Sequence, residues 1–264
     1  MRFINFKIIC FLWLILFLFP AIQLVSSCAA KVNSQDGKAL VTLLEGKAFR
    51  IIKATTRLLP LTQGDYVYQD DQVKTEQDSK LELKLPDGSF IRFDESTTFK
   101  LASVLYIKKD KERNINVRMI LGKTWAKVTR LFGKKGGFAI STKTAVAGVR
   151  GTVCRVNVRK DDSVTVKVYW GEILVQKLKD KEKAQESTKQ IGKITKPTRV
   201  SGPYPVPGPH SVSIEEWAYI LKSMQQIKIN RDGSAENPTT FTNEEDRNNW
   251  VDWNKKRDAA MEQK

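Results

Sequence analysis

Residues 81–93 read Leu-Glu-Leu-Lys-Leu-Pro-Asp-Gly-Ser-Phe-Ile-Arg-Phe. Apolar and polar residues alternate over 81–85, with the period of two that a half-buried β-strand requires, and a strand-like run resumes with Phe-Ile-Arg-Phe after the central Pro-Asp-Gly-Ser. Pro86 at the second turn position and Gly88 at the fourth suit a tight turn around Pro86 and Asp87. The segment therefore predicts two strands joined by a turn.

The same alternation recurs downstream, for example in Ser-Val-Thr-Val-Lys-Val at 163–168. Regularly spaced short strands predict a sandwich, a barrel or a solenoid. A glycine between two strand-like runs recurs at Gly46, Gly122 and Gly171, and glycine permits a kink or tight turn there. This recurrence favours one layer type used several times. We therefore expect a mainly β fold, with an all-β domain over residues 38–178 built as a sandwich or a β-solenoid.

One or two short helices are predicted after this domain. Residues 179–212 read as a charged loop and then a Pro-rich connector. Ser213 and Glu216 form a capping box, and apolar residues follow it at helical spacing. They are Trp217, Ile220, Leu221, Met224 and Ile227. A second helix is predicted around residues 244–262 of the 213–264 extension. Its cap is expected to be Thr242 or Asn243.

The N-terminus has the pattern of a secretory signal. Two basic residues, Arg2 and Lys7, precede an apolar run over residues 8–20. This run is shorter than the ~20 residues that a transmembrane helix needs, and Pro20 ends it. We therefore expect residues 1–27 to be a signal peptide and the rest of the chain to be exported.

Residues 25–28, Val-Ser-Ser-Cys, resemble the lipobox of bacterial lipoproteins. The resemblance implies cleavage before Cys28 and acylation of that residue, and several acyl chains anchor a protein stably. Ala29, rather than Asp, favours the outer membrane by analogy with enteric sorting. Residues 28–37 would then be a tether. Two alternatives stay open: an unlipidated Cys28 beside an ordinary cleavage site, or an uncleaved anchor over residues 8–25.

The chain is strongly basic, with a formal net charge of +16. Such a charge favours an anionic partner through long-range attraction. Nucleic acid is not expected, because an exported chain rarely meets it, whereas anionic lipids, lipopolysaccharide phosphates and acidic polysaccharide are available in an envelope. The alternative is that the charges only keep the surface solvated.

Cysteine and histidine are too few for several kinds of active site. Cys154 is the one cysteine outside the signal and the lipobox, and alternation places it with Val156 and Val158 on the apolar face of a strand. The single histidine, His210, lies in the Pro-rich segment. No histidine-containing triad or multi-histidine metal site can be assembled within one chain. We expect no cofactor, no metal and no enzymatic activity.

Residues 64–158 resemble the FecR-type domain of bacterial envelopes, and the sharpest motif is Ala-Val-Ala-Gly-Val-Arg-Gly-Thr at 145–152. The other motifs are Gly64-Asp65, Val73-Lys74-Thr75 and the segments 78–83, 85–93, 122–128 and 138–142. The resemblance implies an all-β interaction module in the envelope. The founding members also carry a cytoplasmic sigma-factor-binding segment. Only seven residues precede the apolar run here, so we do not expect direct control of a sigma factor.

The residues of the FecR-type motifs are expected to be structural. They are Asp87, Gly88, Trp125, Arg150, Gly151 and Thr152. Gly151 is expected to allow close approach of the backbone, and Thr152 suits a strand. Arg150 lies in an apolar strand context, where a guanidinium must find a partner or reach solvent. We hypothesise that it pairs with Asp87 or Asp94.

These observations predict a lipid-anchored, non-catalytic module that binds, scaffolds or senses in the envelope, with a protein or glycan partner of unknown identity. One alternative is a surface binder of anionic polymers or lipids through basic residues. Those residues would be Lys134, Lys135 and Lys143. Another alternative is an envelope hydrolase that uses paired carboxylates. The pairs are Asp70 with Asp71, Glu76 with Asp78, and Asp161 with Asp162, all in hydrophilic, turn-like stretches.

Overall fold

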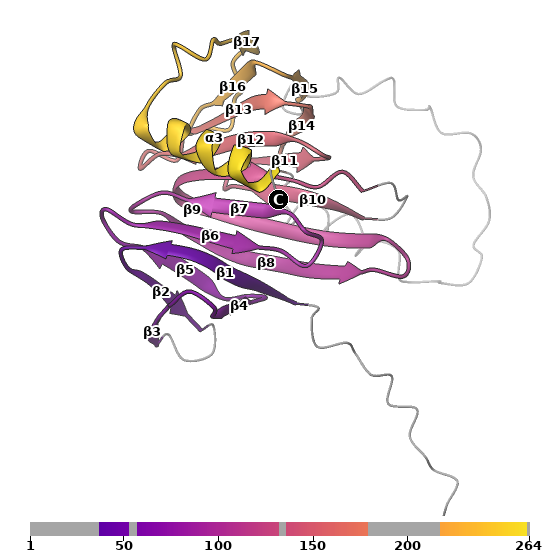
Figure 1. Cartoon of the computed structure of the whole chain (residues 1–264). Helices are drawn as coiled ribbons and strands as arrows, with labels where there is room; N and C mark the ends of the chain where they lie inside the picture. Colours follow the sequence, from indigo (N-terminus) through magenta and orange to yellow (C-terminus); the bar gives the residue numbers. More distant parts are fainter. Residues whose placement is uncertain (1–36, 53–56, 132–135, 179–216, 263–264) are drawn as a thin grey trace, which may run out of the picture. The chain divides into compact units, whose positions relative to one another are not determined.

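Two β-sheets, A and B, make up most of the fold (Figure 1). The structure is a computed structural model that describes residues 37–52, 57–131, 136–178 and 217–262. Sheet A contains, in order, β4 (Tyr66–Tyr68), β1 (Lys38–Glu45), β6 (Lys80–Lys84), β7 (Phe90–Phe93), β9 (Glu112–Lys127), β12 (Val153–Val158), β13 (Val164–Trp170), β16 (Gln225–Ile229) and β17 (Thr239–Thr240). Sheet B contains, in order, β3 (Leu58–Pro60), β2 (Ala48–Ile51), β5 (Gln72–Thr75), β8 (Thr98–Ile107), β9, β10 (Gly136–Ser141), β11 (Ala145–Val149), β14 (Glu172–Lys177) and β15 (Ala218–Lys222).

Strand β9 joins the two sheets. Its first part pairs in sheet B with β8 and, in parallel, with β10, and its second part pairs in sheet A with β7 and β12. Gly122 lies where the strand passes from one sheet to the other, with a φ of 101°. A Cβ atom there would lie 2.6 Å from Thr97 Cα, so the crossing requires glycine.

The hydrophobic core lies between the two sheets. Val164, Val166 and Val168 of β13 are all buried in it, as the period of two predicts. Phe93 of sheet A stacks on Phe99 of sheet B, with ring centroids 3.5 Å apart. Burial of one such side chain stabilises the fold by about 1.5–3 kcal/mol, so this layer is a main source of stability.

The chain advances from the β3 and β4 edge to the β15 and β17 edge while it steps between the sheets, as the colour sequence in Figure 1 shows. The prediction of a mainly β fold is therefore confirmed, and the arrangement combines two facing layers with solenoid-like progression. The predicted turn is also present, because Gly88 N donates to Leu85 O at 3.0 Å between β6 and β7. The predicted domain boundaries stay predictions.

The helix predicted over residues 213–227 is wrong in its described part, which forms β15 and β16. Ser213 and Glu216, the proposed capping box, lie outside the described residues. Leu221 and Ile227 are buried, as a helical stripe would require, but Ile220 is exposed. Pairing of β15 with β14 and of β16 with β13 supplies the backbone hydrogen bonds, and this tertiary pairing overrides the local pattern.

The second predicted helix is confirmed as α3 (Asn249–Glu262). Its cap is Asn248, whose Oδ1 accepts a hydrogen bond from Val251 N at 3.1 Å. The predicted cap Thr242 instead closes the preceding turn, because it exchanges hydrogen bonds with Glu245 at 2.8 and 3.2 Å. The prediction of a cap at Thr242 or Asn243 is therefore wrong, because the helix begins after Asn248.

Candidate functional site: the outer face of sheet A

A row of polar and aromatic side chains crosses the outer face of sheet A. Cross-strand partners in register point to the same face of a sheet. We call this set the polar row, and its members in register are Glu82 of β6, Arg92 of β7, Trp125 of β9, Arg155 of β12 and Lys167 of β13. The row points away from the core because the residues that flank it in sequence, such as Leu81 and Leu83, are core residues.

Helix α3 lies across the polar row, and Figure 1 shows it running over the strands of sheet A. Glu82 accepts hydrogen bonds from Arg92 Nε at 2.7 Å and from Thr42 Oγ1 at 2.7 Å. Arg257 of α3 binds both carboxylate oxygens of Glu82, at 3.0 and 2.9 Å. The side chains of Glu82 and Arg92 are 0% exposed. Charges this deeply buried are stable only because they are paired.

Asp258 makes the second link between α3 and the sheet. Its Oδ1 accepts a hydrogen bond from Arg92 Nη1 at 2.7 Å, and its Oδ2 accepts one from Trp125 Nε1 at 2.9 Å. At the end of the helix, Lys127 of β9 pairs with Glu262 at 2.8 Å. These contacts fix the second half of the helix on the sheet.

Asp246 makes a third link, just before α3. Its carboxylate accepts hydrogen bonds from Arg155 Nη2 at 2.6 Å and Lys167 Nζ at 2.9 Å. The hydroxyl of Tyr169 also donates to it. Two cations of the polar row are therefore held by one carboxylate of the C-terminal segment.

An aromatic cluster fills the space between these ion pairs. Trp125 contacts Tyr169 with ring centroids 4.4 Å apart, and Trp250 stacks on Trp253 at 5.5 Å. Trp125, Trp250 and Val251 are buried in this cluster, which is separate from the core between the sheets. The outer face of sheet A thus has its own apolar contact with α3.

The ionisation of the buried groups follows from these contacts. Burial acts to raise the pKa of Glu82, but hydrogen bonds from Arg257, Arg92 and Thr42 outweigh it and leave that pKa below its ordinary value. For Asp246, burial is likewise outweighed by bonds from Tyr169 and Lys167, so its pKa is also lowered. Both carboxylates are therefore ionised at neutral pH.

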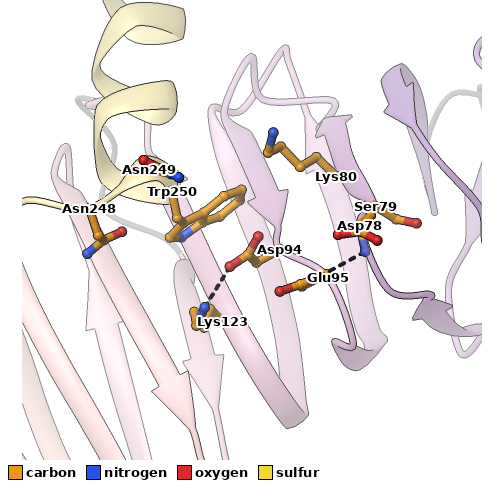
Figure 2. Close-up of a pocket in the computed structure, with 9 residues that line it drawn as sticks. All are labelled: Asp78, Ser79, Lys80, Asp94, Glu95, Lys123, Asn248, Asn249 and Trp250. Atoms are coloured by element: carbon orange, nitrogen blue, oxygen red, sulfur yellow. Dashed lines mark hydrogen bonds and ion pairs between the residues drawn. The ribbon is translucent and has the colours of Figure 1, made fainter.

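A cavity of about 600 Å³ opens beside the start of α3 (Figure 2). We call it the α3 cavity, and its lining residues are Asp78, Ser79, Lys80, Asp94, Glu95, Lys123, Asn248, Asn249 and Trp250. Figure 2 shows Asn249 and Trp250 at the start of the helix on one side, and residues from the start of β6, the end of β7 and Lys123 of β9 on the other. Lys123 pairs with Asp94 at 2.8 Å, and Glu95 accepts a hydrogen bond from Asp78 N at 2.8 Å. Polar groups of the cavity are therefore held in place beside the ring of Trp250.

A second hollow, of about 320 Å³, lies on β12, β13 and β16. We call it the basic groove, and its lining residues are Arg155, Asn157, Arg159, Thr165, Lys167, Gln226, Ile227, Lys228, Glu236, Asn237 and Thr239. Asn157 of the groove is in register with Lys123 of the α3 cavity. The two hollows therefore occupy neighbouring positions on one face.

The hypothesis about Arg150 is wrong. Arg150 is exposed, and each of the two proposed partners is bound to another cation. Asp87 pairs with Arg113 at 2.9 Å, and Asp94 pairs with Lys123. The buried ion pair of the turn at 86–87 is thus made by Arg113, which lies outside the FecR-type motifs.

Other motif residues have structural contacts. Asp87 also accepts hydrogen bonds from Ser89 N and Oγ, at 3.0 and 2.7 Å. Gly151 has a φ of 62°, and a Cβ there would lie 2.6 Å from Arg130 Cβ. Thr152 is buried and its Oγ1 donates to Glu172 O at 3.1 Å. Trp125 differs from these residues because it belongs to the polar row, where it contacts Asp258 of α3 and Tyr169.

The predicted basic residues are only partly described. Lys143 is exposed and pairs with Asp162 at 2.6 Å. Lys134, Lys135 and the lipobox Cys28 lie outside the described residues. Lys143 is therefore the one predicted contact whose surroundings the structure shows.

The predicted carboxylate pairs mostly serve local structure. Asp71 pairs with Arg50 at 3.3 Å, and Asp70 pairs with Lys100 at 2.6 Å. Asp161 accepts hydrogen bonds from Ser163 at 2.7 and 3.0 Å. Asp78 is the member of these pairs that lines the α3 cavity.

Cys154 behaves as its position in the alternation predicts. Its side chain is buried in the core between the sheets, and burial raises the pKa of its thiol to about 12. A thiol of this kind is inert, because the thiolate is the reactive form.

Residues 71–174 match the family model described as FecR protein, so the chain contains a FecR-type domain. The match begins just before β5 and ends within β14, later in both places than the predicted span of 64–158. Arg257, Asp258 and Asp246 lie outside it. Their partners on the polar row lie inside it.

Two crystal structures of a proposed anti-sigma factor from Parabacteroides distasonis ATCC 8503 are similar to this chain. Their sequence identities are 17% and 18%, and the TM-score is 0.41 for both. Each comparison covers 64% of this chain and 59% of that chain. No curated protein matches the sequence at a significant level. Among the described residues, no helix is both long and apolar enough to cross a bilayer.

Proposed function

We propose that this protein is a non-catalytic binding module of the bacterial cell envelope that acts as a scaffold or sensor. Lipid on Cys28 would hold it at the membrane, with the outer membrane as the destination that Ala29 favours. The FecR-type domain at 71–174 supports this proposal. The signal-like residues 1–27 and the lipobox-like residues 25–28 support the export and the anchor.

One observation carries the proposal: α3 is pinned over sheet A by buried ion pairs with Glu82 and Arg92. The start of the helix forms one wall of the α3 cavity, so the shape of that cavity is set before any partner arrives. A preorganised surface loses little conformational entropy on binding, which favours affinity. The partner is an envelope protein or glycan that docks on this face.

The proposal is tested by photo-crosslinking in intact cells. A photoreactive amino acid replaces Asn249, which is exposed at the α3 cavity, or Lys109, which is exposed in the turn between β8 and β9. We expect one dominant adduct from position 249 that is absent from position 109. If neither position yields an adduct, or both yield the same set, no partner docks at the α3 cavity.

The anchor is tested separately with labelled palmitate. The unmodified chain should incorporate the label and the Cys28→Ser variant should not, because the lipobox resemblance places the lipid on that sulfur. Labelling that survives Cys28→Ser would contradict the anchor while leaving the binding face untouched.

A second candidate function is the binding of anionic envelope polymers. The predicted contact Lys143 already pairs with Asp162, so it does not favour this function. The basic groove does, because four cations line it.

A further inference from the structure

We propose that the basic groove is a binding site for an anionic sugar, one that carries a carboxylate or a phosphate beside free hydroxyl groups. This proposal names a ligand class for the binding module. It rests on the proposed function in one respect, namely that a cell envelope makes such sugars available.

The floor of the groove is built by two rows of side chains on the outer face of sheet A. Partners in register on β12, β13 and β16 point to the same face. One row is Arg155, Lys167 and Gln226, and the other is Asn157, Thr165 and Lys228. Cations and uncharged hydrogen-bonding groups therefore lie side by side over a small area.

Positive charge exceeds negative charge around this floor. The cations are Arg155, Lys167, Lys228 and Arg159. Three carboxylates interact with them: Glu236 pairs with Lys228 at 2.7 Å, Asp246 holds Arg155 and Lys167, and Asp161 interacts electrostatically with Arg159. Among the described residues, four cations thus meet three anions. An anionic ligand would reduce this excess, and a groove of one sign concentrates ligands of the other.

Two buried polar atoms of the groove have no hydrogen-bond partner within the described part of the chain. They are Arg155 Nε and Asn157 Oδ1. The Arg155 side chain is 7% exposed, so its unpaired donor is costly unless a ligand supplies an acceptor. An anionic oxygen would accept from the guanidinium in a charge-assisted bond. A hydroxyl both donates and accepts, so it can serve the Asn157 amide in either orientation.

The remaining lining favours a sugar over a lipid. Thr165, Gln226, Asn237 and Thr239 offer hydroxyl and amide groups, which suit the hydroxyls of a sugar ring. Ile227 is the apolar residue of the lining and is buried, so the groove offers little apolar surface to acyl chains. The volume of about 320 Å³ lies at the lower end of the ~300–1,000 Å³ range of small-ligand sites. The groove therefore fits a small polar ligand.

Calorimetry on the purified full chain tests this assignment. The probes are trigalacturonate for the carboxylate source, glucose 6-phosphate for the phosphate source, and maltotriose as the neutral sugar. The groove variant is Arg159→Gln with Lys228→Gln. The control variant, Lys74→Gln with Lys100→Gln, removes the same charge from two lysines of sheet B that are also in ion pairs, as Lys228 is. Thermal melting checks that both variants stay folded.

We expect one anionic sugar to bind and maltotriose not to bind. The groove variant should weaken that binding at least about tenfold, the loss expected for a charge-assisted contact, and the control variant should leave it unchanged. Equal weakening in both variants would overturn the site, because it would indicate diffuse charge attraction. Groove-dependent binding of anionic phospholipid vesicles without binding of either sugar would overturn the ligand class.

The outcome is independent of the crosslinking experiment. A partner captured at Asn249 together with no sugar binding would reject only this inference. Sugar binding with no adduct at Asn249 would keep the groove and reject the α3 cavity as the docking face.

Discussion

Glu82 and Arg257 lie 175 positions apart and form a bidentate ion pair, with Arg257 Nε and Nη2 donating to the two carboxylate oxygens at 3.0 and 2.9 Å. The pair joins β6 of the FecR-type domain to α3, which lies outside the matched residues. It closes the outer face of sheet A with the C-terminal segment. The α3 cavity depends on this closure, because Asn249 and Trp250 of the helix line it.

Replacement of Glu82 tests how much the buried network contributes. Glu82→Gln keeps the side-chain size and removes the charge that Arg92 and Arg257 share. We expect the free energy of unfolding to fall by about 3 kcal/mol, the lower end for breaking a buried pair, because Arg92 keeps Asp258. Urea denaturation measures this change.

The matched control is Glu45→Gln, which removes a partly exposed ion pair with Lys80. Such a pair contributes less than about 1 kcal/mol. Equal losses in the two variants would show that the buried network contributes no more than a surface pair.

Acid should destabilise the fold through Glu82 and Asp246. Folding lowers the pKa of both carboxylates, so the unfolded chain binds their protons more readily. Their contribution is present above the ordinary carboxyl pKa of about 4 and is lost as the pH falls through the lower folded-state values. We expect melting temperatures to drop below about pH 4. The double variant Glu82→Gln with Asp246→Asn should show a shallower drop, and an unchanged slope would contradict the assignment.

Trp125 should contribute more to the free energy of unfolding than an exposed tryptophan does. Trp125→Phe keeps a ring against Tyr169 but loses the N–H that donates to Asp258. The unpaired carboxylate oxygen should cost about 1–3 kcal/mol, measured by chemical denaturation. Trp170→Phe serves as the control, because that side chain is 58% exposed. A loss of the same size in both variants would argue against the contact with α3.

Two glycines of the sharpest FecR-type motif should respond differently to alanine. Gly151 has a φ of 62° and approaches Arg130 closely, so Gly151→Ala should cost at least about 1–2 kcal/mol. A Cβ atom added at Gly148 would have its nearest neighbour at 3.7 Å, and this glycine has no positive φ. Gly148→Ala should therefore change the free energy of unfolding by less than about 0.5 kcal/mol. Thermal melting compares the two, and the reverse order would contradict the description of this motif.

Local features of the fold could be predicted from the sequence because they depend on neighbours in the chain. The turn at 86–87 follows from Pro and Gly spacing, and the burial of Cys154 with Val156 follows from the period of two. The helix over 213–227 was mispredicted because Trp217 and Leu221 fit a helical stripe and also fit the same face of a strand. Pairing with β14 and β13 selects the strand conformation.

The candidate site could not be predicted in the same way. The face of α3 that contacts sheet A carries the polar residues Asn254 and Asp258 in its middle, so this part of the helix has the sequence of a solvent-exposed one. Arg92 and Arg155 alternate with core residues along their strands, so the sequence predicts that they face solvent. Their partners, Asp258 and Asp246, are distant in the chain. The available signal was Trp250 and Trp253 in an otherwise polar segment, which indicates burial against something.

Hydrogen exchange of α3 in the purified full chain tests the central claim most directly. If the buried pairs with Glu82 and Arg92 pin the helix, the amides of its middle, around Asn254 to Asp258, should exchange about as slowly as those of β9. They should also exchange markedly faster in Glu82→Gln. Fast exchange in the unmodified chain, as in an exposed isolated helix, would contradict the account.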